Sequence, residues 1–179
     1  MKKLTFIIIA IILTVNLSAQ EKPRKFDFKI GSGIGFMGSG DAMTLCLENE
    51  LDYKLSNYFS TSIGIGIGRT SVSETRHNDY LQGSLNVFIS PFRNDKRNNF
   101  RVGVGYTRIN ESITYLTYRE QTTNIYHYFY NTINGFNLIL ENDYQITSRF
   151  LLGGKLFVTG GIYEGGVVSG AMIKFGIVL

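Results

Sequence analysis

The stretch from Phe59 to Gly68, F-S-T-S-I-G-I-G-I-G, constrains the fold most strongly because apolar and small residues alternate along it. Side chains of an extended strand alternate between its two faces, so one face carries Ile63, Ile65 and Ile67 while the other carries serine and glycine. In a soluble sheet the small face would waste core volume and weaken the strand. Such a strand suits the wall of a narrow eight-stranded barrel in a membrane. Its large apolar side chains would face the lipid, and its small residues would face the lumen.

The same alternation recurs along the chain and predicts an all-β fold, an eight-stranded antiparallel up-and-down transmembrane β-barrel. An even number of strands is typical of a closed single-chain barrel. The expected strands are Phe26 to Phe36, Met43 to Leu55, Phe59 to Arg69, Tyr80 to Ser90, Phe100 to Thr107, Thr132 to Tyr144, Arg149 to Ile162 and Gly170 to Leu179.

The connections are expected to alternate between short periplasmic turns and longer external loops. Residues 56–58 and 145–148 form short turns in this prediction, whereas the polar segment Ser71 to Asp79 and the segment Asn110 to Asn131 are external. Ile139, Leu151 and Phe157 interrupt otherwise polar inward faces.

Residues 1–19 are predicted to be a secretory signal peptide. Lys2 and Lys3 precede an apolar run from Leu4 to Val15, and Ala19 offers a cleavage point. The run is shorter than the roughly 20 residues that cross a bilayer as a helix. Residues 20–179 would then form one outer-membrane β-barrel domain.

Composition excludes several classes of function. Cys46 is the single cysteine, so no internal disulfide can form, and two distant histidines provide no metal-site spacing. We therefore expect no metal and no cofactor. Without the signal segment the basic excess is small and no basic run is present, which argues against nucleic-acid binding.

Charged residues on the inward faces are expected to form an ion-pair network that fills the lumen. Unpaired charges would be costly to bury, so we interpret these residues as a structural plug rather than a substrate site. The predicted network comprises Glu48, Lys155 and Lys174 near mid-height and Glu50, Glu141, Arg101, Asp143 and Lys29 nearer the periplasmic end.

At this point the chain resembles the small outer-membrane β-barrel domain family, the OmpA/OmpX-type eight-stranded barrels of Gram-negative bacteria. The likeness rests on the turn L-S-N-Y-F from Leu55, the I-G-I-G-I-G strand and the last strand ending K-F-G-I-V-L at Leu179. It implies residence in the outer membrane, contact with outer-membrane lipid and lipopolysaccharide, and recognition of the last strand by the barrel-insertion machinery.

Three alternatives remain open. A soluble calycin-type barrel would expose the glycine face to water, which gives the small residues no purpose. A lipid-modifying enzyme could use His77 at the rim with Ser73, Glu74 or Asp79, although a polar loop rarely fixes a catalytic geometry, so no enzymatic activity is expected. A small-solute channel is disfavoured because eight strands leave too narrow a lumen.

The segment between the fifth and sixth strands contains two runs rich in aromatic and β-branched residues, 113–118 and 125–130. They predict a hairpin that rises beyond the membrane. Such a hairpin offers backbone edges and tyrosines to an extracellular protein or glycan, or packs on lipopolysaccharide. The predicted contact residues are Tyr115, Tyr118, Tyr126 and Tyr128.

Overall fold

The computed structural model describes residues 25–37, 42–73, 76–94, 97–119, 124–161 and 167–179. The predicted signal peptide lies outside these residues and stays a prediction. None of the described residues belongs to a helix that is long and apolar enough to cross a membrane.

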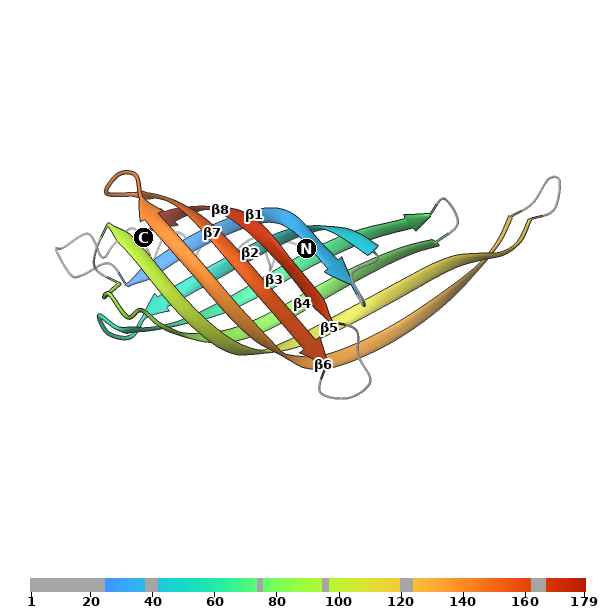
Figure 1. Cartoon of the computed structure of the whole chain (residues 1–179), viewed down its shortest axis with the longest axis horizontal. Coiled ribbons are helices and arrows are strands. Elements are labelled where there is room, and N and C mark those ends of the chain that lie inside the picture. Colours follow the sequence, from blue (N-terminus) through green and yellow to red (C-terminus); the bar gives the residue numbers. More distant parts are fainter. Residues whose placement is uncertain (1–24, 38–41, 74–75, 95–96, 120–123, 162–166) are drawn as a thin grey trace, which may run out of the picture.

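Eight antiparallel strands follow one another around a closed barrel, in which β8 pairs with β1 (Figure 1). The fold class predicted from the sequence is therefore confirmed. The strands are β1 (Phe26–Met37), β2 (Ala42–Lys54), β3 (Phe59–Ser73), β4 (Arg76–Ile89), β5 (Asn98–Arg119), β6 (Asn124–Gln145), β7 (Phe150–Gly161) and β8 (Val168–Val178).

The outer wall of the barrel is an exposed apolar belt. Burial largely alternates along the barrel part of each strand, so the aliphatic side chains of one face point outward. A belt of this kind would be insoluble in water and matches the lipid-facing band of a membrane barrel. Its members include Ile30, Ile34, Leu45, Leu47, Ile63, Ile65, Ile67, Leu81, Leu85, Val104, Leu138, Leu140, Leu156 and Ile173.

Short turns and the described chain ends lie at one end of the barrel, which we assign to the periplasm. Lys25 accepts a backbone hydrogen bond from Lys54, and Leu179 donates one to Phe26. The same end carries aromatic rings with cations over them, since Arg97 lies 5.0 Å from the centroid of the Tyr144 ring.

Four predicted strand limits in the outer part of the barrel need correction. The segment Ser71 to Asp79, predicted as a loop, is mostly strand, because β3 continues to Ser73 and β4 begins at Arg76. β5 runs on to Arg119 instead of ending at Thr107, and β6 begins at Asn124 instead of Thr132. Strands that extend past the lipid have water on both faces. Apolar residues on one face and small residues on the other are then no longer needed, and the prediction relied on that alternation.

The lumen is not polar throughout. The residues that interrupt the inward polar faces, Ile139, Leu151 and Phe157, are buried inside the barrel. Ile139 and Phe157 belong to a hydrophobic cluster with Tyr80, Phe88 and neighbouring side chains. Such packing excludes water from the part of the lumen that it fills.

Candidate functional site

Charged side chains from six strands meet inside the barrel. β2 supplies three carboxylates at alternate positions, and β6 supplies two more, because every second residue points into the lumen. The cations come one each from β1, β5, β7 and β8. The members are Glu48, Glu50, Asp52, Glu141, Asp143, Lys29, Arg101, Lys155 and Lys174, all of them buried. We call this set the lumen network.

Arg101 lies at the centre of the lumen network. Its guanidinium is 2.7 Å from Glu50 and 2.8 Å from Glu141, and it also pairs with Asp52 at 2.9 Å. Its Cζ atom lies 3.9 Å from the centroid of the Phe88 ring. Arginine suits this position because its planar fork can bind several carboxylates while its face stacks on an aromatic ring.

Two further cations of the network, Lys155 and Lys174, also pair with its carboxylates. Lys155 donates to Glu48 at 2.6 Å. Lys174 reaches Glu50 at 2.9 Å and Glu141 at 3.2 Å. The fold thus brings together six of the eight residues that the sequence predicted as a charge network, namely Glu48, Glu50, Arg101, Glu141, Lys155 and Lys174.

Lys29 binds the carboxylates at the periplasmic side of the network. Its Nζ atom is 2.7 Å from Asp52 and 2.8 Å from Glu141, and it is hydrogen-bonded to Asp143 as well. Sequence reasoning did not assign Asp52 to the network. Its spacing of two residues from Glu50 on an inward-facing strand was the signal that could have found it.

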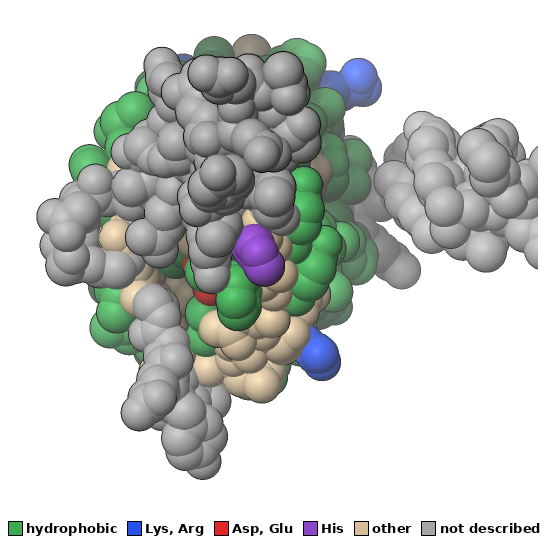
Figure 2. Space-filling model, turned by 90° about the vertical axis from the view of Figure 1, so that its right-hand side faces the viewer, with side chains coloured by type: hydrophobic (Ala, Val, Ile, Leu, Met, Phe, Trp, Pro, Cys, Tyr) green, Lys and Arg blue, Asp and Glu red, His purple; other side chains and the backbone are tan. Residues whose placement is uncertain are grey.

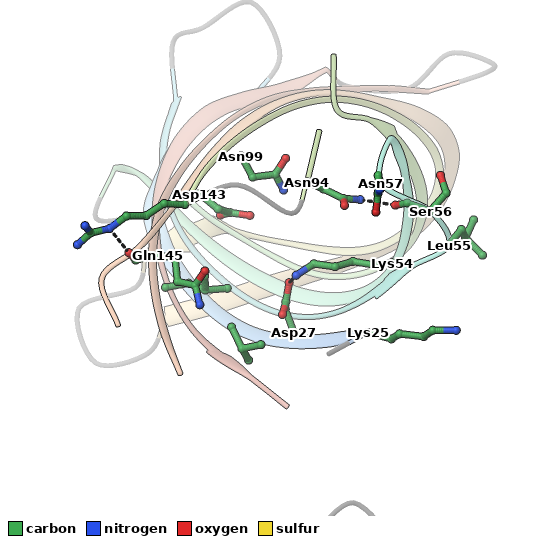
Figure 3. A pocket seen from close by; sticks show the side chains of 13 residues that line it. Lys25, Asp27, Lys54, Leu55, Ser56, Asn57, Asn94, Asn99, Asp143 and Gln145 are labelled. Carbon is green, nitrogen blue, oxygen red and sulfur yellow. Dashed lines mark hydrogen bonds and ion pairs between the residues drawn. The ribbon is translucent and has the colours of Figure 1, made fainter. Parts of the chain in front are cut away.

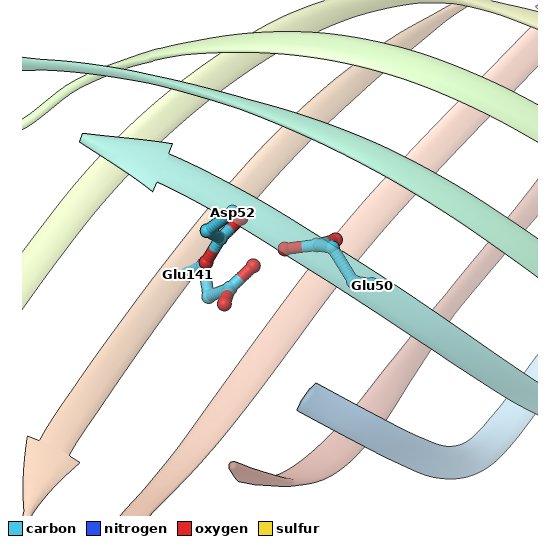
Figure 4. A group of neighbouring side chains, drawn as sticks. All are labelled: Glu50, Asp52 and Glu141. Carbon is cyan, nitrogen blue, oxygen red and sulfur yellow. The ribbon is translucent and has the colours of Figure 1, made fainter. Parts of the chain in front are cut away.

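The carboxylates of Glu50, Asp52 and Glu141 come within 4.8 Å of one another, a spacing that could hold a metal ion (Figure 4). Lysine and arginine nitrogens already contact each of these three side chains. The positive charges that three adjacent carboxylates require therefore come from the chain itself, and we interpret the group as part of the ion-pair network.

The lumen network and the hydrophobic cluster leave little space between them. A cavity lined by Glu48, Lys155 and Tyr80, among others, has a volume of about 10 Å³. That volume is close to the space of a single water molecule. The arrangement suits a plug and gives no support to a solute channel.

A larger cavity opens at the periplasmic end (Figure 3). It has a volume of about 410 Å³, and we call it the periplasmic vestibule. Its lining includes Asp27, Lys54, Asn94, Asn99 and Asp143. Sequence reasoning did not predict this cavity, because Asp27 and Asn99 are far apart in the chain and only the closed barrel brings them to one mouth.

The residues of the enzymatic alternative lie on strands or outside the described side chains. His77 is in β4, opposite Thr114 of β5, rather than in a loop. The Asp79 carboxylate is bound by Arg69, with Nε and Oδ1 2.9 Å apart. The side chain of Ser73 and the whole of Glu74 lie outside the described part of the structure.

The predicted surface tyrosines lie on the paired outer parts of β5 and β6. Tyr115 pairs with His127, Leu116 with Tyr126, and Tyr118 with Ile125 in the ladder. Tyr128 is exposed. The side chains of Tyr115, Tyr118 and Tyr126 lie outside the described part of the structure, so only their backbone positions are assigned.

No family model matches the chain, and no curated protein is significantly similar to it in sequence. Solved structures do match its fold. Neisserial surface protein A (NspA) superposes with a TM-score of 0.65 at 9% identity, covering 86% of this chain and 97% of that chain. Ail, the attachment invasion locus protein of Yersinia pestis, gives 0.60 at 8% identity, with 87% and 99% covered.

The outer membrane protein OprG of Pseudomonas aeruginosa matches with a TM-score of 0.59 at 12% identity, over 86% of this chain and 96% of that chain. The likeness extends over nearly the whole of each neighbour. Together with the exposed apolar belt and the closed eight-stranded sheet, it leads to one conclusion. This chain is an integral outer-membrane protein with the fold of the small eight-stranded outer-membrane β-barrels.

Proposed function

We propose that the protein binds an extracellular protein by strand addition along the outer part of β6. The observation that carries the proposal is an edge of β6 that continues beyond its pairing with β7. The register of β6 with β7 ends at Gly135 opposite Gly161, whereas its register with β5 continues to Asn124.

The paired outer parts of β5 and β6, residues 108–119 and 124–134, form a ribbon that extends beyond the other strands (Figure 1). Tyr106 and Phe136 are the last large apolar side chains of the outward rows before the exposed polar residues Arg108 and Asn134. The strand from Asn134 to Asn124 is long enough to span about 35 Å. The ribbon therefore places recognition groups well outside the lipid.

Backbone groups of outer β6 face a side on which no described strand pairs with it. In an antiparallel ladder, successive residues direct their N–H and C=O groups alternately to the two neighbouring strands. The N–H of Gln145 donates to the carbonyl of Arg97, the residue just before β5. In β6 the backbone groups of odd-numbered residues therefore face β5, and those of even-numbered residues face the β7 side. Tyr128, Tyr130 and Thr132 accordingly direct their backbone groups to the open side.

Aromatic side chains accompany this edge. Tyr128 is 60% exposed and Tyr130 is 81% exposed, and both lie on the outward face of β6. Seen from the end that carries the ribbon, the coloured surface is mainly hydrophobic or uncharged, with cationic side chains at its margin (Figure 2). Strand addition takes its affinity from backbone hydrogen bonds and its specificity from such side chains.

Proline substitution tests the edge directly. Thr132→Pro removes an N–H that faces the open side and leaves the β5–β6 backbone hydrogen bonds in place, a position at which an edge strand tolerates proline. The bond that the Thr132 hydroxyl donates to Asn110 is lost in the proline and the valine form alike. Thr132→Val is the matched control because it keeps the N–H. Cells that display each form are tested for attachment to surfaces coated with extracellular-matrix proteins. We expect attachment by the parent and the valine form and its loss in the proline form.

Equal attachment by all three forms, or none by the parent, would contradict strand addition. Ail, which shares the fold, has been crystallised with the heparin analogue sucrose octasulfate. Heparin-coated surfaces therefore serve as a second substrate in the same assay. If Thr132→Pro leaves attachment to heparin unaffected, the partner is a sulfated glycan and not a protein.

A further inference from the structure

One asparagine side chain faces the lipid well inside the apolar belt. Asn49 is exposed on the outward face of β2, between Leu47 and Leu51 of the same row. Its direct neighbours across the two ladders are Ile30 of β1 and Ile65 of β3, which are exposed as well. The amide group is therefore surrounded by aliphatic side chains along the strand and across it.

The height of Asn49 places its side chain in the hydrocarbon of the membrane. Asn49 precedes Tyr53, an aromatic residue at the periplasmic end, by four residues of β2. In a strand that is tilted by about 40°, four residues correspond to about 10 Å of height. The apolar band of a small outer-membrane barrel is about 25 Å tall, so this amide lies away from both headgroup layers.

The side chain of Asn49 has no hydrogen-bond partner among the described residues. Two outward asparagines at the outer end do have partners, although water is available there. Asn134 accepts from the Tyr106 hydroxyl at 2.7 Å, and Asn110 accepts from the Thr132 hydroxyl at 3.0 Å. Lipid chains offer neither donors nor acceptors, so an unpaired amide in the belt is costly. A second transmembrane surface could supply the missing partner.

We propose that the wall formed by β1 and β2 is a dimer interface, at which Asn49 pairs with Asn49 of a second copy of this chain. An asparagine amide has two donors and one carbonyl acceptor, so two of them can exchange a pair of hydrogen bonds. All copies insert in the same direction, and a two-fold axis between them must therefore run along the membrane normal. Such an axis brings identical residues together at equal height, as a pair of Asn49 side chains requires.

A small residue beside Asn49 allows a second barrel to approach closely. Ser32 of β1 is exposed on the outward face and pairs with Leu47, two residues from Asn49 along β2. Small side chains are typical of the places where transmembrane segments pack against each other. Three strands separate β2 from β6 on either side of the barrel, so a partner on this wall leaves the ribbon of β5 and β6 accessible. The inference is independent of the proposed function.

Sedimentation equilibrium in a density-matched detergent measures the dissociation constant of the dimer. We expect the unaltered protein to form dimers and Asn49→Leu to weaken them by about tenfold or more, because both amides are lost. Asn142→Leu is the matched control. Asn142 is an exposed outward asparagine of β6, two residues before Tyr144 and on the opposite wall, so its replacement should leave the dissociation constant unchanged.

Urea unfolding at a high ratio of detergent to protein separates an interface from a structural role within one barrel. Leucine suits a lipid-facing position better than asparagine does, so Asn49→Leu should raise the midpoint of the monomer. A lowered midpoint would show that the amide supports the barrel itself and would overturn the proposal.

Added bulk provides a second test of the wall. Ser32→Phe places a ring where the two barrels approach each other and should weaken the dimer. Leu138→Phe enlarges an exposed residue of the opposite wall, on β6, and should have no such effect. Equal effects of the two changes would contradict an interface on β1 and β2.

An unaltered protein that stays monomeric would also contradict the proposal, and lipid or a different protein would then cover Asn49. Dimers that Asn49→Leu leaves unchanged would place the contact on another wall, and the proposal would be wrong. Equal weakening by Asn49→Leu and Asn142→Leu would overturn it too, because the effect would then not belong to one wall.

Discussion

At the scale of single residues, the barrel depends on side chains that cross its interior. Glu141 of β6 accepts from Lys29 of β1 and from Arg101 of β5, and it also pairs with Lys174 of β8. β1 and β6 are not neighbours in the sheet, so the Lys29 contact passes through the lumen. A carboxylate in this position joins strands that the backbone ladder does not connect.

Replacing Glu141 by Gln should destabilise the barrel strongly. The amide leaves three buried cations with one carboxylate fewer, and breaking a buried ion pair typically costs about 3–5 kcal/mol. Asp79→Asn provides the control, because the Arg69–Asp79 pair is exposed and such pairs contribute less than about 1 kcal/mol. Urea unfolding in detergent micelles measures both. Similar midpoints for the two variants would show that the lumen network contributes little.

The inward glycines make room for large side chains, and this can be tested at one position. A Cβ atom at Gly68 would overlap the ring of Tyr80, whose hydroxyl contacts Cys46 in the lumen. Gly68→Ala should therefore lower the free energy of unfolding by about 1–3 kcal/mol. Gly83 has no atom within 4 Å of its Cβ position, so Gly83→Ala should cost nothing. The comparison fails if both changes have the same effect in urea.

At the scale of strands, the periodic pattern predicts faces better than it predicts lengths. Alternation from Phe59 to Gly68 separates an exposed from a buried face, as the structure also does. The same rule does not extend to the outer parts of β3 to β6, because water on both sides permits polar residues on either face. Strand ends there depend on pairing with a neighbour, which a single segment of sequence does not encode.

Sequence reasoning grouped Glu48 with Lys155 and Lys174 near mid-height of the lumen, and the structure pairs Glu48 with both lysines. The pattern places Glu48 and Lys155 on inward faces, but their 2.6 Å contact depends on the stagger of strands around the barrel. The vestibule depends on the same stagger, since Asp27, Asn99 and Asp143 come from three different strands. Alternation gives the face of a residue, and counting from the strand ends adds its approximate height, but the full set of partners across the lumen follows only from the stagger.

Shortening the β5–β6 ribbon should leave the barrel intact. Replacing residues 115–127 by Asn-Gly places a two-residue turn between Thr114 and Tyr128, which already pair. The apolar belt of both strands ends before that region, so lipid contacts are unchanged. We expect the shortened form to keep the anomalous gel mobility of a folded barrel before boiling. Failure to insert into lipid would show that the ribbon is needed for folding rather than for recognition.

At the scale of the whole molecule, closure of the sheet is what makes a membrane position feasible. Lipid offers no hydrogen bonds to an open strand edge, so the first and last strands must pair with each other. β1 and β8 do so from Asp27 opposite Val178 to Met37 opposite Val168. The lumen network and the hydrophobic cluster then fill the interior, and the recognition surface is left to the outer ribbon.

Hydrogen exchange at this junction tests the closed membrane barrel most directly. The N–H of Leu179 donates to Phe26, so the even residues of β1, among them Phe28 and Ile30, direct their amides to β8. With the protein in lipid nanodiscs, NMR should show these amides exchanging as slowly as those in the middle of β3, such as Ile65. Rapid exchange at Phe28 and Ile30 beside slow exchange at Ile65 would show an open sheet and would contradict the account.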